Sequence, residues 1–276
     1  FGMRDKMDKL QRSERIAILT KIFADSPGKL FSLGNFTEMF GAAKSTISED
    51  IDIIQRALEG FGIGTIRSMP GVSGGVFFVP SVGKERVYEI LNSLCSELSK
   101  KERILPGGYL YMQDIIYDPC VVFNVGRIFA QEFIDRKIDY VVTVETKGIP
   151  LAFATANNLN TPLVIVRRNS EATDGPSVNI NYVSGSSRKL QTMVLSLKAL
   201  KRKSRLLFID DFMKGGGTAR GIIELAKEFE CEVAGIGVLI ATAEPAKKLV
   251  DSYFSLLTLN RVDEENNIID IRNGLC

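Results

Sequence analysis

Apolar residues recur at helical spacing in the first part of the chain. Residues 12–25 predict a helix, ended by Pro27-Gly28, whose apolar face consists of Ile16, Leu19, Ile22 and Phe23. A second, shorter helix is predicted over residues 33–40 and ends at Gly41. A third is predicted in AAKSTISEDIDIIQRALEG, where one apolar stripe consists of Ile47, Ile51, Ile54 and Leu58.

The second and third predicted helices are joined by a tight Gly/Ala turn, which is typical of a helix-turn-helix. The following segment, GTIRSMPGVSGGVFFVP, alternates around a Gly- and Ser-rich tip and predicts a β-hairpin, or wing. In such a domain the recognition helix presents its first turns to DNA, and the polar residues there are Lys44, Ser45, Thr46 and Ser48. We therefore expect residues 3–80 to form a winged helix that binds double-stranded DNA.

A second interpretation of residues 12–80 is a small helical cap or a dimerisation module. Glu49, Asp50 and Asp52 favour this interpretation, because on a recognition helix they must face away from phosphates or lie at the helix start, where acids are favourable. Charge does not decide between the two, since residues 1–80 hold 10 Lys and Arg against 9 Asp and Glu.

Residues 81–276 predict an α/β domain with a mainly parallel sheet flanked by helices, preceded by a linker helix. The linker helix has an apolar stripe of Val87, Leu91, Leu94 and Leu98. Strands are predicted at residues 140–144, 162–166, 206–209, 232–240 and 254–259. The polar stretch 169–189 has a strand-like centre, VNINYVSG, and its length suggests a lid.

The segment LLFIDDFMKGGGTARG carries the clearest chemistry. Its buried strand is followed by two carboxylates and a glycine-rich turn, and then by a helix from Thr218. Glycines let backbone amides approach an anion at a helix N-terminus, and the hydroxyl-accepting carboxylates Asp210 and Asp211 suit a sugar. The segment is neither GxxxxGK[ST] nor GxGxxG, which argues against an ATPase P-loop and a dinucleotide site. The alternative is an ordinary strand-to-helix turn with Asp near the helix start.

Basic residues follow two other predicted strands. Lys147 comes after the strand 140–144, and Arg167 and Arg168 end the strand 162–166. Because the carboxyl ends of parallel strands share one edge of the sheet, we expect these residues to meet an anion beside Asp210. Lys147 as a solvated loop charge remains an alternative.

Composition excludes several kinds of site. The chain has 276 residues, a formal net charge of +2, no histidine and 4 cysteines without a CxxC pair, so zinc sites and histidine catalysis lose support. No apolar run approaches the length of about 20 residues that spans a bilayer, and the N-terminal residues lack a signal-peptide core. We expect a cytoplasmic protein with no membrane partner.

The acidic pair followed by a glycine-rich turn and Thr resembles the signature of type I phosphoribosyltransferases. The resemblance implies that Asp210 and Asp211 hold the ribose of phosphoribosyl pyrophosphate (PRPP). It also implies a 5′-phosphate site made by Lys214, Gly215, Gly216, Gly217 and Thr218, and a pyrophosphate site made by Thr146, Lys147 and Gly148 with Arg167 and Arg168. Enzymes of this class carry a small residue and Thr where this chain has Lys214 and Gly215, so we expect binding without transfer.

Taken end to end, the chain resembles the purine operon repressors of Gram-positive bacteria. The resemblance is carried by KSTISED, ERILPGGY, TKGIPLA, INYVSGSS and LLFIDDFMKGGGT. It implies a homodimeric repressor of purine genes that is not an enzyme and whose DNA affinity falls when PRPP binds. Guanosine tetra- and pentaphosphate are implied competitors, with Tyr109 and Phe212 as candidates for a base pocket. The alternative for Tyr109 is an ordinary half-buried strand tyrosine.

Magnesium is expected only together with PRPP, because the pyrophosphate itself provides hard oxygen ligands; we expect no metal site made by the protein alone. The main alternative function is a purine or xanthine phosphoribosyltransferase with an extra N-terminal domain, favoured by the intact acidic pair and pyrophosphate loop. An RNA-binding attenuator on the same fold is a weaker alternative, because such a protein needs no winged helix.

Overall fold

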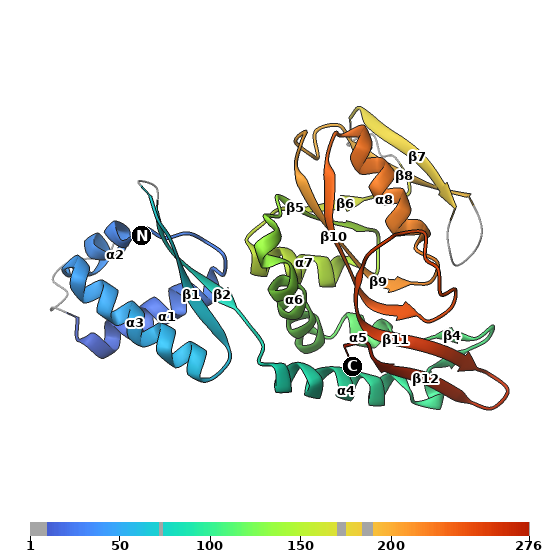
Figure 1. Cartoon of the computed structure of the whole chain (residues 1–276), viewed down its shortest axis with the longest axis horizontal. Helices are drawn as coiled ribbons and strands as arrows, with labels where there is room; N and C mark the ends of the chain where they lie inside the picture. The colour runs from blue at the N-terminus through green and yellow to red at the C-terminus, as the bar shows by residue number, and fades with distance from the viewer. Residues whose placement is uncertain (1–9, 72–73, 170–174, 184–189, 276) are drawn as a thin grey trace. The chain divides into compact units, whose positions relative to one another are not determined.

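A computed structural model gives the structure of the chain over residues 10–71, 74–169, 175–183 and 190–275 (Figure 1). It divides into two compact units, Phe1–Gly83 and Lys84–Cys276, which are described separately below. Parts of the stretch predicted as a lid, residues 170–174 and 184–189, lie outside the described residues, as does the tip of the wing at residues 72–73.

The first unit is a winged helix. Its elements are α1 (Arg12–Asp25), α2 (Leu33–Phe40), α3 (Lys44–Gly60), β1 (Gly64–Met69) and β2 (Gly75–Pro80). The strands β1 and β2 pair in antiparallel register, which confirms the predicted hairpin. The core contains the apolar stripes of all three helices and the inner face of the hairpin: Leu19, Phe23, Phe36, Ile47, Ile51, Ile54, Ile66, Val76 and Phe78.

The second unit is built on a sheet of six strands in the order β12-β11-β10-β9-β5-β6. These strands are β5 (Tyr140–Val144), β6 (Leu163–Val166), β9 (Arg205–Met213), β10 (Glu232–Thr242), β11 (Phe254–Asp263) and β12 (Ile268–Asn273). All neighbours are parallel except the edge pair β11 and β12, so the predicted mainly parallel sheet is confirmed.

Helices cover both faces of this sheet (Figure 1). The unit begins with α4 (Lys84–Leu98), whose stripe packs on β12 and β11. Small elements follow: η1 (Lys101–Arg103), the hairpin β3 (Ile104–Leu105) and β4 (Tyr109–Leu110), and α5 (Gln113–Ile116). The main layers consist of α6 (Pro119–Phe133), which leads into η2 (Ile134–Arg136), α7 (Ile149–Leu159), α8 (Gly217–Glu228) and the hairpin β7 (Ser177–Val183) and β8 (Leu190–Ser196).

Side chains along β9 alternate between the two faces of the sheet and pack against the layers on both sides. Leu206 and Phe208 pack into the cluster formed with α8, β7 and β8. Leu207 and Ile209 point to the opposite face, toward the phenylalanines of α6. Both sets are buried, because a central parallel strand is covered on its two sides. No helix in the described part of the chain has the length and apolarity needed to cross a membrane.

The strands β5 and β9 lie at the point where the strand order reverses. From β5 the chain moves outward to β6, and from β9 it moves the other way to β10. The ladder between β5 and β9 ends at Val142 and Phe208, whereas the ladder between β9 and β10 continues to Met213. The sheet therefore opens on one side of β9 beyond Phe208, at a topological switch point where α/β proteins bind ligands.

This arrangement corrects the predicted strand at residues 206–209. The strand runs on to Met213 and contains the acidic pair, because the long partner β10 supplies backbone hydrogen-bond partners for four more residues. Local sequence suggested a loop after Ile209, since charged residues and glycines are poor strand formers.

Candidate functional site

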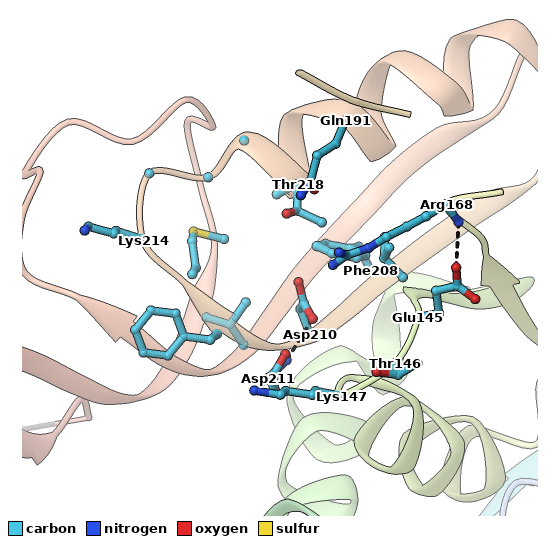
Figure 2. Close-up of a pocket in the computed structure, with 18 residues that line it drawn as sticks. Glu145, Thr146, Lys147, Arg168, Gln191, Phe208, Asp210, Asp211, Lys214 and Thr218 are labelled. Carbon is cyan, nitrogen blue, oxygen red and sulfur yellow. Dashed lines mark hydrogen bonds between the residues drawn. The ribbon is translucent and has the colours of Figure 1, made fainter. Parts of the chain in front are cut away.

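A pocket of about 540 Å³ lies at the opening between β5 and β9 (Figure 2). Three stretches supply most of its lining: Val144–Lys147 at the end of β5, Asp210–Met213 on β9, and the loop Lys214–Thr218. Figure 2 shows the acidic pair with Thr218 on one side and Thr146 and Lys147 on the other. The structure thus brings together most of the residues that the sequence predicts for the ribose, 5′-phosphate and pyrophosphate.

The acidic pair forms the floor of the pocket. The backbone N–H of Asp211 donates to Oδ1 of Asp210 at 3.0 Å. Burial raises the pKa of Asp210 well above its usual value, and the neighbouring charge of Asp211 raises it further, while the Arg168 guanidinium opposes both. Two half-buried carboxylates at this position are acceptors for the vicinal hydroxyls of a sugar.

The loop Lys214–Thr218, termed the glycine loop, leads from β9 into α8. Gly216 has a φ of 81°, a left-handed conformation that favours glycine, and α8 begins at Gly217. Within the described chain, no protein acceptor is found for the N–H groups of Gly215 and Gly216, and the first helical turn adds further N–H groups without intrahelical partners. This is the geometry of an anion site at a helix N-terminus.

The segment Glu145–Gly148 faces the acidic pair from the end of β5. Oε1 of Glu145 accepts from the backbone N–H of Arg168 at 2.7 Å, which links this segment to the end of β6. Gly148, the N-cap of α7, lies so close to the acidic pair that an added Cβ would lie 2.9 Å from Oδ1 of Asp210. Thr146 and Lys147 are exposed, and both line the pocket.

Two predicted residues lie elsewhere. Arg167 pairs through its backbone with Val194 of β8 and lines a separate hollow, whereas Arg168 lines the pocket. Because side chains alternate along an extended strand, adjacent arginines point to opposite sides. Tyr109 lies on β4, is 65% exposed, and is not among the residues that line the pocket, whereas Phe212 is.

The structure adds residues that sequence reasoning missed. Glu145, Gln191 and Phe208 also line the pocket. Gln191 belongs to β8, and its Oε1 accepts from the hydroxyl of Tyr182 at 2.6 Å. No local motif marks Gln191, because only the tertiary fold brings the β7–β8 hairpin over α8. Glu145 was identifiable as the residue that ends the β5 strand pattern.

In the first unit, the predicted DNA-contacting residues lie at the start of α3. Lys44, Ser45 and Ser48 are exposed, and Thr46 is half-buried. Of the acidic residues that favoured a non-DNA role, Glu49 and Asp52 are exposed and Asp50 is buried. Asp50 is fully buried and accepts hydrogen bonds from Arg12 at 3.0 Å and from Arg15 at 2.9 Å, so its charge is paired inside the domain.

Comparisons with known proteins match both units. Residues 11–80 match the N-terminal domain of the bacterial purine repressor, and residues 112–272 match the phosphoribosyl transferase domain. The purine biosynthesis transcriptional repressor PurR of Bacillus subtilis is 47% identical over 266 residues, which cover 96% of this chain and 93% of that protein. The purine biosynthesis transcriptional activator PurR of Lactococcus lactis subsp. lactis is 38% identical over 265 residues, covering 96% and 98%.

The second unit also resembles enzymes. A xanthine phosphoribosyltransferase of Lactococcus lactis subsp. cremoris is 29% identical over 176 residues, covering 59% of this chain and 89% of that protein. The crystal structure of adenine phosphoribosyltransferase from Rhodothermus marinus superposes with a TM-score of 0.52 at 20% identity, covering 62% of this chain and 99% of that chain. The last similarity establishes a shared fold.

Proposed function

The chain belongs to the family of bacterial purine biosynthesis transcriptional regulators, in which a purine-repressor N-terminal domain precedes a phosphoribosyltransferase domain, and from this premise we propose that it is a PRPP-sensing repressor of purine genes. The observation that carries the proposal is the joining of a winged helix to a sugar-phosphate pocket in one chain. The winged helix binds operator DNA, and the pocket reports the supply of PRPP.

On the DNA side, the proposal rests on α3. Its first turn presents Lys44 and Ser45 to solvent, with a cation for phosphate and hydroxyls for base edges. Asp50 supports this role, because it pairs with two arginines of α1 and fixes the angle of α3 instead of opposing DNA. We expect the protein to bind its operator as a homodimer.

On the effector side, each part of PRPP meets a matching group. The 5′-phosphate accepts hydrogen bonds from the glycine loop and the hydroxyl of Thr218. The ribose hydroxyls donate to Asp210 and Asp211. The pyrophosphate lies at the segment Glu145–Gly148 beside Arg168, which contributes the cation that the sequence assigned to both arginines.

Magnesium enters with this ligand. The described residues contain no cluster of three metal-ligating side chains, and the carboxylates that line the pocket are those of Glu145, Asp210 and Asp211. A pyrophosphate bridges a hard cation through its own oxygens, and water completes the coordination. We expect the cation to neutralise part of the ligand's charge beside the acidic pair.

Guanosine tetra- and pentaphosphate are proposed as competitors of PRPP. They carry phosphate groups for the glycine loop and a purine ring for the aromatic wall at Phe212. Figure 2 shows the Lys214 side chain extending away from the acidic pair. We expect this ammonium to bind the additional phosphates of these ligands. Enzymes of the phosphoribosyltransferase class carry a small residue where this chain has Lys214, so the additional cation distinguishes this chain from them.

Sensing requires that PRPP bind the DNA-free conformation better than the DNA-bound one. A coupling free energy of about 1 to 3 kcal/mol gives a change in operator affinity of about fivefold to 150-fold. The alternative function is a purine or xanthine phosphoribosyltransferase, favoured by the xanthine phosphoribosyltransferase similarity and by the complete acidic pair.

One experiment separates the two functions. The protein is titrated onto DNA from upstream of purine genes in a gel-shift assay, with and without PRPP and Mg²⁺, and is also assayed for nucleotide formation from PRPP with adenine, guanine, hypoxanthine or xanthine. We expect DNA binding that PRPP weakens, and no nucleotide. Steady nucleotide formation at about 1 per second or faster, without operator binding, would establish the enzyme instead.

A further inference from the structure

A buried lysine lies directly behind the glycine loop. Lys248 belongs to the segment between β10 and β11, and its side chain is 9% exposed. Its ammonium donates to the backbone oxygen of Lys214 at 2.6 Å, to the backbone oxygen of Thr242 at 2.7 Å and to Oγ1 of Thr242 at 3.3 Å. Three N–H groups thus meet three oxygens, all of them neutral acceptors.

The neighbouring backbone holds the loop in the same way. The N–H of Leu249 donates to the oxygen of Gly215 at 2.9 Å. An added Cβ on Gly216 would lie 3.3 Å from the nitrogen of Leu249 and 3.6 Å from Cβ of Lys248, so the segment and the loop are in direct contact. The segment therefore binds two successive carbonyl groups of the glycine loop from one side.

The geometry of the peptide bond determines the direction of the N–H groups in the glycine loop. In a trans peptide the C=O and N–H groups point in opposite directions, and both peptides joining Lys214, Gly215 and Gly216 are trans. Because the two carbonyls point to the Lys248 segment, the N–H groups of Gly215 and Gly216 point away from it, on the side of the pocket. Burial lowers the pKa of Lys248, and the negative charge of Glu244 opposes this shift. The lowered pKa reflects the free energy needed to take the ammonium out of water.

We propose that Lys248 is a positioning residue for the effector phosphate: it fixes the carbonyl of Lys214 so that the loop presents its N–H groups to a phosphomonoester. The proposal rests on the proposed function, in which the glycine loop holds the 5′-phosphate of PRPP. Lys248 touches no ligand itself. It stabilises the arrangement of amides before the ligand arrives, which lowers the ordering cost of binding.

The test compares two probes by calorimetry: ribose 5-phosphate, which needs the glycine loop, and magnesium pyrophosphate, which needs the segment Glu145–Gly148. Lys248→Met is expected to weaken ribose 5-phosphate by about tenfold to a hundredfold, because a charged hydrogen-bond network is lost behind the loop. Pyrophosphate affinity is expected to stay within about twofold of the parent. Lys248→Arg keeps donors and charge and should restore most of the affinity, and Lys247→Met, at an exposed neighbour, is the control.

The outcomes are separable. Parent protein that binds neither probe refutes the proposed function itself. If the parent binds both probes, two results for a folded Lys248→Met variant overturn the role of Lys248 alone. One is unchanged affinity for ribose 5-phosphate, and the other is an equal loss of affinity for both probes. If Lys248→Met does not fold, Thr242→Val removes a hydroxyl that accepts from the same ammonium and itself donates to the backbone oxygen of Lys214, and it should weaken only ribose 5-phosphate, by about threefold to tenfold. Unchanged affinity in that variant overturns the role as well.

Discussion

Gly148→Ala adds one methyl group at the point where α7 meets the acidic pair. Gly148 has φ −71° and ψ −18°, which alanine adopts without strain. The added Cβ would lie 2.5 Å from Oγ1 of Thr143 and 2.9 Å from Oδ1 of Asp210, both too close for an unshifted neighbour. The effect of this substitution is therefore steric.

The magnitude follows from two opposing contributions. Replacing glycine by alanine at a compatible backbone stabilises by about 0.4 to 1 kcal/mol through the unfolded state. Overpacking costs about 1 to 3 kcal/mol. The free energy of unfolding should fall by about 1 to 2 kcal/mol, which lowers Tm by about 2 to 8 °C for a unit of this size. Thr143 is fully buried within β5, so the Asp210 carboxylate at the open pocket is the group that moves.

Displacing that carboxylate removes a charged hydrogen bond to the ribose, so PRPP should bind about tenfold to a hundredfold more weakly. The assay is thermal unfolding followed by PRPP titration of the same sample. Gly60→Ala is the control, because nothing lies within 4 Å of its added Cβ; it should keep PRPP affinity and should raise the free energy of unfolding by about 0.4 to 1 kcal/mol through the unfolded state. A Gly148→Ala protein with the parent's Tm and PRPP affinity would refute the packing argument.

Three further predictions concern charge and contact. Lys44→Ala should weaken specific and non-specific DNA binding alike and reduce the salt slope by about one unit, whereas Thr46→Ala should reduce discrimination between operator and random DNA; unchanged isotherms for both would exclude α3 as the recognition helix. Asp50→Ala leaves the Arg15 guanidinium buried without its partner and should lower the free energy of unfolding by about 3 to 5 kcal/mol in denaturant titrations, and a loss within experimental error would contradict this. Asp210→Asn should raise Tm at neutral pH without ligand, because a carboxyl whose pKa is raised in the folded state favours unfolding above its unfolded value of about 3.9; the gain should shrink as the pH falls toward that value and vanish below it, and a gain independent of pH would contradict the assignment.

Local patterns predicted the elements of this protein well. The helices at residues 12–25 and 33–40 begin and end where the apolar stripe and the glycine stops place them. The sequence predicted a mainly parallel sheet but not the order of its strands, because strand pairing depends on contacts between segments that are distant in the sequence. The acidic pair shows where prediction from local sequence ends. The residues DDFM resemble a loop, yet pairing with β10 extends β9 through them to Met213.

Some residues of the candidate site could be identified from the sequence, and others only from the fold. Asp210, Lys147 and the glycine loop were identifiable, because each follows an apolar run at the end of a strand. Gln191 and Lys248 were not, since one reaches the pocket through the β7–β8 hairpin and the other supports it from a segment 34 residues beyond Lys214. Arg167 had the right charge and position in the sequence, but strand alternation turns it to another hollow.

The most direct test of the central claim is a gel-shift of operator DNA titrated with PRPP, using the parent and Asp210→Ala. Asp210 lies in the second unit, so the variant should bind operator without PRPP as tightly as the parent. Releasing the DNA should then require about tenfold to a hundredfold more PRPP, because a charged acceptor for the ribose is lost. If the variant releases DNA at the parent's PRPP concentration, the pocket between β5 and β9 is not the sensor.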